Sequence, residues 1–158
     1  QRPGLPLTCA QGKSLPVAND TLDAVLAECS FSAMANMDAV LDEFQRILRP
    51  GGRLAISDIY ARSSEGIPDL RALPLSSGLR DVLPQIELVD LLRDHGFEIL
   101  VWQDHSDALK YLMAQMILSC GSMNAFWSCS EPAADPSELQ LAIRRAKLGY
   151  YMLIAKKI

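Results

Sequence analysis

The stretch that decides the fold is residues 22–60, which read LDAVLAECSFSAMANMDAVLDEFQRILRPGGRLAISDIY. The apolar run at residues 22–27 is framed by turns and too short for a helix, so it predicts a buried strand. An amphipathic segment, a Pro-Gly-Gly turn and a second apolar run at residues 54–56 follow. Two strands joined by a helix in this way form a parallel pair, and ligands gather beyond the carboxyl ends of such strands.

The helix of this unit is predicted to begin at Asn36, with Asp38 in its first turn, where the helix dipole favours a carboxylate. On its outer face we expect Asp42 to pair with Arg46, one helical turn away. Pro50 cannot continue the helix, and a following glycine can reverse the chain. The stripe expected to pack on the sheet consists of Val40, Leu41, Phe44, Ile47 and Leu48.

The remaining elements follow from periodicity and turn residues. Residues 7–10 read as a strand, and residues 62–84 lose all pattern, which is typical of a lid or a substrate loop. Ser106 is expected to cap a helix that packs Met113 and Met116 in the core and stops at Gly121. The other expected elements are a helix at 85–95, a strand at 97–102, a loop at 121–136, a helix from Ser137 to about 148, and a closing strand at 150–156.

Composition limits the class of protein. The chain has 158 residues, of which 49% are hydrophobic, and a formal net charge of −4, which suits one globular domain and disfavours nucleic acid as a partner. No apolar run is long enough to cross a membrane, and the first residues lack the plan of a signal peptide. We therefore expect a cytoplasmic protein without membrane contact.

Cysteine and histidine spacing gives no metal motif. The four cysteines form no CxxC pair, and the chain is not a small cysteine-dense scaffold, so reduced thiols are expected. His95 and His105 are the only histidines, and no HExxH is present. We expect no metal site.

Three motifs in register resemble one family. The run SLPVANDTLDAVLAEC, the helix, and LRPGGRLAISD are similar to the second half of class I S-adenosylmethionine-dependent methyltransferases, in particular the small-molecule branch with ubiquinone-biosynthesis and arsenite enzymes. The resemblance implies an α/β fold with a Rossmann-like, mostly parallel sheet whose last strand is antiparallel. It also implies an incomplete domain that contains strands 3 to 7 of that fold.

The resemblance divides residues 1–158 into three parts of one partial methyltransferase domain. Residues 1–60 contain the adenine loop and the unit of strand 4, a helix and strand 5. Residues 61–84 form the lid or substrate loop. Residues 85–158 contain the last helices and strands 6 and 7. The implied cofactor is S-adenosylmethionine, and the implied partner is a small-molecule acceptor.

Cofactor-binding residues follow from the same resemblance. Gln11 and Gly12 occupy the places of the adenine-binding acidic residue and the amide after it; a glutamine amide can still bond an adenine edge. Leu15, in an apolar island, packs under the ligand or under the domain itself. The segment that lines the methionine moiety corresponds to Ala27, Glu28 and Cys29.

Catalytic candidates lie at the strand ends that this topology brings together. They are Asp58, Tyr60 and His105, with Asp104 and Tyr150 nearby. Each also has a structural interpretation: Asp58 could satisfy a helix amino terminus, and His105 could be a solvated loop residue. Likewise, Cys29 could be a small buried residue, and Glu28 could bind a cation or face water.

The family's first strand and its glycine-rich turn have no counterpart here. If the family order holds, residues 23–27 form an unpaired apolar edge. We therefore expect a carboxyl-terminal fragment of a longer protein, inactive by itself, whose edge is covered by an upstream segment or by the second copy of a homodimer. Two alternatives remain open: a metalloid methyltransferase that uses Cys29, and a catalytically inactive methyltransferase-like interaction module.

Overall fold

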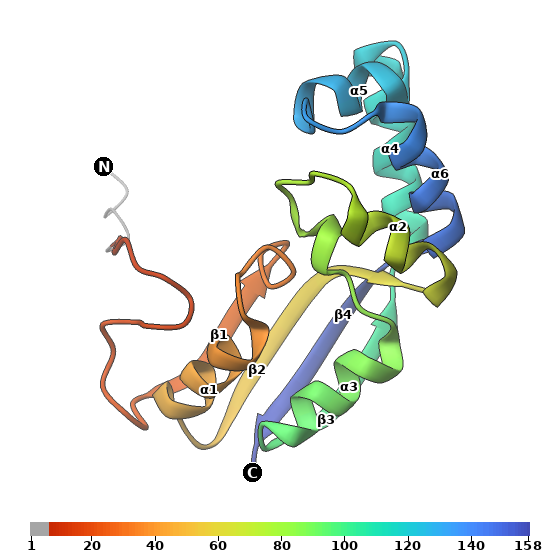
Figure 1. Ribbon diagram of the computed structural model, residues 1–158. Helices are drawn as coiled ribbons and strands as arrows, with labels where there is room; N and C mark the ends of the chain where they lie inside the picture. Colours follow the sequence, from red (N-terminus) through yellow and green to blue (C-terminus); the bar gives the residue numbers. More distant parts are fainter. Residues whose placement is uncertain (1–6) are drawn as a thin grey trace.

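A four-stranded sheet lies at the centre of the computed structural model, which describes residues 7–158 (Figure 1). The spatial order is β1 (Leu22–Glu28), β2 (Leu48–Ala61), β4 (Leu148–Lys157) and β3 (Phe97–Asp104). β1 and β2 are parallel, whereas β4 is antiparallel to both β2 and β3. This confirms the predicted mostly parallel sheet with an antiparallel last strand.

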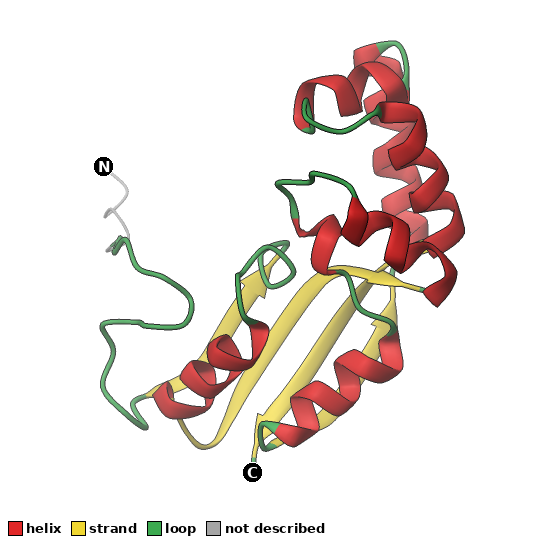
Figure 2. Cartoon of the chain, in the orientation of Figure 1, coloured by secondary structure: helices red, strands yellow, loops and turns green. Residues whose placement is uncertain are grey.

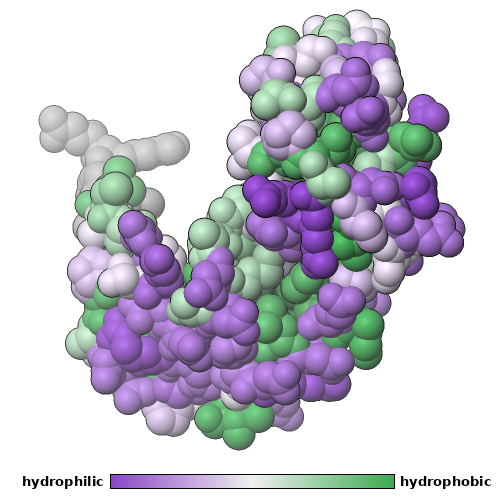
Figure 3. All heavy atoms as spheres, viewed as in Figure 1, coloured by the Kyte–Doolittle hydropathy of each residue, from purple (hydrophilic) through white to green (hydrophobic). Residues whose placement is uncertain are grey.

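Two helices, α1 (Met37–Ile47) and α3 (Gln85–Asp94), cover one face of this sheet (Figures 1 and 2). Asn36 caps α1 as predicted, because its Oδ1 accepts from the Ala39 amide at 3.1 Å. The outer surface of this layer, in the lower part of Figure 3, is mainly hydrophilic. The core between sheet and helices includes Val40, Leu41, Phe44, Ile47, Leu54, Ile56, Leu92 and Leu153.

Side-chain pairing on α1 differs from the prediction. Arg46 pairs with Glu43 at 2.7 Å and not with Asp42. Asp42 is instead 2.8 Å from Nδ1 of His95, which lies at the end of α3. The expected pairing of Asp42 with Arg46 was wrong because a tertiary partner outcompetes a neighbour on the same helix.

The first expected strand does not form. Residues 7–10 are in no strand, and the next residues make a tight turn in which the Ser14 amide donates to the Gln11 carbonyl at 2.9 Å. In the part of the chain that the structure describes, β1 is the edge strand and pairs only with β2, so no neighbour is present for a further strand. The sheet therefore contains four of the five expected strands, and the predicted open edge is present.

The segments expected to be loops are largely helical. Residues 64–81 contain α2 (Ile67–Ala72) between two short 3-10 helices, and residues 121–136 contain α5 (Met123–Ser130). Together with α4 (Ser106–Cys120) and α6 (Pro136–Ala146) they form a helical cap beyond one end of the sheet (Figure 1). We use "helical cap" for α2, α4, α5 and α6.

Helix starts in the cap also differ from expectation. Asp135, not Ser137, caps α6, since its Oδ1 accepts from the amides of Ser137 and Glu138 at 2.9 Å. Ser106 is the first residue of α4 and not its cap. A second cluster of buried side chains holds the cap to the end of β2; it includes Ala61, Ile67, Leu70, Leu79, Leu139 and Ala142.

Candidate functional site

The carboxyl ends of β1 and β2 lie side by side. Glu28 pairs with Ser57, and the Cys29 amide donates to the Ser57 carbonyl at 2.7 Å. The exposed Cys29 thiol is 3.0 Å from the Tyr150 hydroxyl on β4. Burial, together with the hydrogen bond to Cys29, raises the pKa of Tyr150. The topology thus brings together Glu28, Cys29 and Tyr150, as predicted from the order of the strands.

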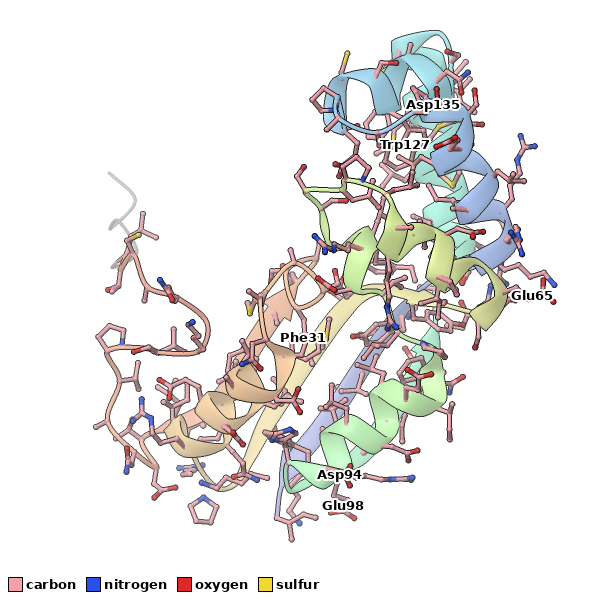
Figure 4. All side chains as sticks on the ribbon, in the orientation of Figure 1. Phe31, Glu65, Asp94, Glu98, Trp127 and Asp135 are labelled. Carbon is pink, nitrogen blue, oxygen red and sulfur yellow. The ribbon has the colours of Figure 1, made fainter. Side chains whose placement is uncertain are left out.

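Asp58 lies on the opposite side of β2, in the layer covered by α1 and α3. Its Oδ2 accepts from the Ser32 amide at 2.8 Å, and its Oδ1 from the Ser32 hydroxyl at 2.9 Å and the Ile59 amide at 2.7 Å. The side chain is 3% exposed. These contacts fix the loop between β1 and α1, whose Phe31 lies against the sheet (Figure 4).

Tyr60 points to the same covered side. Its hydroxyl donates to Asp104 Oδ2 at 3.0 Å, and its ring meets Trp102 edge to face at 5.4 Å between centroids. Burial, reinforced by Asp104, raises the pKa of Tyr60. Hydrogen bonds from Ser106 lower the pKa of Asp104, which is thereby held as a carboxylate. This arrangement braces β2, β3 and the start of α4.

His105 is exposed between β3 and α4. Its amide donates to the Tyr150 carbonyl at 2.7 Å, and its Nε2 is 3.2 Å from Gln103 Oε1. The backbone therefore places His105 beside Tyr150, while its ring faces solvent. A role as base stays a prediction for His105, and the same holds for Asp58 and Tyr60.

The turn that carries Gln11 and Gly12 is held on α1. Glu43 Oε1 accepts from the Leu15 amide at 2.6 Å, and Arg46 donates to the Leu15 carbonyl at 3.2 Å. The hydrogen bond from Arg46 is the main reason why the pKa of Glu43 falls to about 2. An ion pair on the first helix therefore sets the position of the candidate adenine turn.

The residues predicted to contact the cofactor differ in how closely their surroundings are packed. A Cβ on Gly12 would come within 2.7 Å of the Met34 sulfur, so the glycine packs closely against the loop that follows β1. Ala27 is 2% exposed and belongs to the core, so almost none of its surface is open to a ligand. Cys29 has φ +46° directly after β1, which turns the chain away from the strand end.

A cavity of about 680 Å³ opens between the end of β2 and the helical cap. Its wall is largely apolar and includes Met113 and Met116 from α4. Trp127 from α5, labelled in Figure 4, also lines it. The two methionines are half-buried and line this space, so the prediction that they pack in the core was wrong. Glu131, 2% exposed, closes one side by accepting from the amides of Ser76 and Ser77 at 2.8 and 3.0 Å.

The described residues contain no cluster of three or more His, Cys, Asp and Glu side chains suited to a metal ion. Over the same residues, no helix has the length and apolar character needed to cross a membrane.

Comparison with known proteins agrees with this geometry. A family model described as a methyltransferase domain matches residues 1–56. A demethylmenaquinone methyltransferase of Corynebacterium urealyticum is 30% identical over 121 residues, which are 63% of this chain and 53% of that protein. The O-methyltransferase resE of Aspergillus sclerotiorum is 32% identical over 160 residues, covering 94% of this chain and 55% of the relative. The chain is therefore similar to methyltransferases over most of its length.

Solved structures share the fold of this chain. The [4+2]-cyclase SpnF superposes with a TM-score of 0.70 at 29% identity, over 95% of this chain and 54% of that one. The chain therefore spans about half the length of these similar proteins. S-adenosylmethionine is the cofactor of the methyltransferase family.

Some residues of this chain suit part of that cofactor. The turn at Gln11 and Gly12 offers main-chain and amide groups to an adenine edge. Glu28 and Cys29 offer exposed polar groups at the end of β1. These residues could hold the adenine and the methionine part.

Sequence reasoning missed the cavity and its polar residues. Arg62, Arg144, Lys147 and Glu131 line it, and they come from segments that were expected to be loops or plain helix. One signal was present: Asp135 followed by Pro136 is a typical helix start, which limits the loop after Gly121 and leaves room for another helix.

Proposed function

We propose that this chain supplies the acceptor side and part of the cofactor site for methyl transfer from S-adenosylmethionine to a small-molecule acceptor. The observation that carries the proposal is the pair of sites at one end of the sheet. A turn suited to adenine is fixed on α1, and an apolar cavity opens beyond β2. The exposed Cys29 and the half-buried Tyr150 lie at the strand ends between the two segments.

The cofactor supplies a methyl group on a positively charged sulfur, which an acceptor nucleophile displaces in line. Such a reaction requires the protein mainly to align the groups and to exclude water. We assign alignment of the adenine to Gln11, Gly12 and Leu15, and contact with the methionine part to Glu28 and Cys29. The helical cap would hold the acceptor and exclude water from it.

The open edge of β1 is where we expect a further segment or a second copy of the chain to pair. Leu26 on this strand is 67% exposed, and an apolar edge of this kind favours further pairing. An upstream segment or a second copy of the chain would cover the edge and complete the cofactor site. The chain alone is then expected to bind the cofactor weakly and to be inactive.

Calorimetric titration with S-adenosylmethionine tests the proposal. The chain is titrated alone and again with whatever residues precede Gln1 in the gene restored. We expect heat of binding from the longer protein, weakened several-fold in Gln11→Ala because the amide contact to adenine is lost. Gln115→Ala on the exposed face of α4 is the matched control and should bind normally. No heat from the longer protein would reject the proposal.

A metalloid methyltransferase is the second candidate, because Cys29 is exposed at the strand ends and thiolates suit arsenic. Free thiols are counted with a thiol reagent before and after arsenite is added. Protection of Cys29, lost in Cys29→Ser, supports this candidate, whereas unchanged thiol reactivity contradicts it.

A further inference from the structure

The cavity in the helical cap combines an apolar wall with cations at its rim. Leu109, Met113 and Met116 from α4 and Phe126 and Trp127 from α5 face it. A wall of methionine and aromatic side chains provides a large apolar contact that adapts to the shape of a ligand. At about 680 Å³, the space has the size of a site for an organic molecule.

Three cationic side chains border the same space: Arg62, Arg144 and Lys147. Within the described residues none of the three lies within 4.0 Å of a carboxylate oxygen, whereas the next residue along α6, Arg145, pairs with Asp69 at 2.7 Å. Arg62 is partly committed, because its Nε donates to the Lys147 carbonyl at 3.0 Å and its charge acts on Asp104. Arg144 and Lys147 are therefore the cations available to a ligand.

The one carboxylate in the wall does not neutralise them. Both oxygens of Glu131 accept hydrogen bonds from Ser76 and Ser77. Burial would raise the pKa of Glu131, but these hydrogen bonds outweigh it and lower the pKa. The lining thus carries three positive charges against one negative charge that is already satisfied.

We propose that the acceptor has a large apolar body and one anionic group, a carboxylate or a phosphate, with the body between α4 and α5 and the anion on Arg144 and Lys147. The inference rests on the proposed function in one respect, that this cavity is the acceptor site. An apolar molecule without charge would leave both cations unpaired, and a small anion would leave the apolar wall uncovered.

A matched pair of fluorescent probes tests both halves of the inference. 8-Anilinonaphthalene-1-sulfonate is anionic, and N-phenyl-1-naphthylamine has the same ring system without the charge. We expect the chain to bind the anionic probe more tightly. The double variant Arg144→Gln, Lys147→Asn should weaken the anionic probe by roughly tenfold and leave the neutral probe unchanged. Asparagine is chosen because residue 147 has φ +50°.

Two controls locate the probe. Arg49→Gln, Arg53→Gln removes the same charge from exposed positions at the start of β2, away from the cap, and should bind both probes normally. Leu26→Asp changes the exposed edge of the sheet and should also have no effect. Unfolding curves of all variants should coincide with that of the unaltered chain.

The inference is overturned if both probes bind equally, if the control pair weakens the anionic probe as much as the cavity pair, or if only Leu26→Asp weakens it. The cofactor titration described above is independent of these results. If the longer protein binds S-adenosylmethionine but the affinity for the probes does not depend on Arg144 and Lys147, only this inference is rejected. Selective probe binding without any heat from the cofactor rejects the proposed function and leaves the anionic apolar site in place.

Discussion

The sheet with α1 and α3 and the helical cap use apolar residues in different ways. In the sheet layer, Leu54 and Leu153 are completely buried between strands and helices. In the cap, α4 is rich in apolar residues, yet Tyr111 is 70% and Leu118 80% exposed. Helical spacing determines which residues share a face, but only a second surface at the right distance turns that face into a core.

The largest expected effect follows directly from this contrast. Leu153→Ala removes a fully buried side chain from the sheet layer and should lower the free energy of unfolding by about 3–5 kcal/mol. Leu112→Ala on α4, where the side chain is 48% exposed and lines the cavity, should cost less than about 1 kcal/mol. Urea unfolding of both variants measures the difference. Equal costs would show that the cap is packed as tightly as the sheet.

The sheet layer could be predicted because its signals are local. Asn36 begins α1, and the helix ends at Ile47, shortly before Pro50 and the two glycines. The closing strand could be placed for the same reason. The extent of β2 could not, since fourteen residues form this strand and only the short run at 54–56 is continuously apolar enough to indicate it. Pairing with β1 and β4 extends β2 beyond that run.

The candidate site was harder to predict because its chemistry depends on which side of a strand faces a ligand. Asp58 and Tyr60 are predicted to face a ligand, but neighbouring residues in a strand alternate between its two faces. Asp58 and Tyr60 therefore point into the covered layer, while Ile59 lines the cavity. The helices packed against the sheet determine which face of a strand is covered. The spacing of residues within one strand does not indicate this.

In each region a buried carboxylate holds a loop: Asp58 in the sheet layer and Glu131 in the helical cap. Asp58→Asn replaces an acceptor oxygen that faces Ser32 with a donor and should cost about 2–3 kcal/mol of stability. Glu131→Gln disturbs Ser76 and Ser77 in the cap and should cost about 1–2 kcal/mol. Urea unfolding followed by the fluorescence of Trp127 and of Trp102 separates a local change from a global one.

Asp58→Asn is expected to move the transitions of both tryptophans, because the sheet layer unfolds as a unit. Glu131→Gln should mainly move the signal of Trp127, which lies in the same wall of the cavity. The exposed Asp107→Asn serves as control and should leave both transitions in place. In the longer protein, a loss of methyl transfer in Asp58→Asn without any loss of stability would instead support the predicted catalytic role of this residue.

The smallest expected effect is a pH dependence confined to the sheet layer. His95 at the end of α3 has Nδ1 2.8 Å from Asp42 and Nε2 3.1 Å from Asp38, both on α1. Burial opposes the charged form, but the two carboxylates outweigh it and raise the pKa of His95.

Because the folded pKa lies above the unfolded value of about 6.5, the stabilisation is complete below that pH and is lost as pH rises through the folded pKa. Both carboxylates are largely exposed, so the loss should be only about 0.5–1 kcal/mol. Urea unfolding at pH 5.5 and pH 8.5 measures it, and His95→Gln, which cannot titrate, should remove the dependence; a difference that persists in this variant would assign it to other groups.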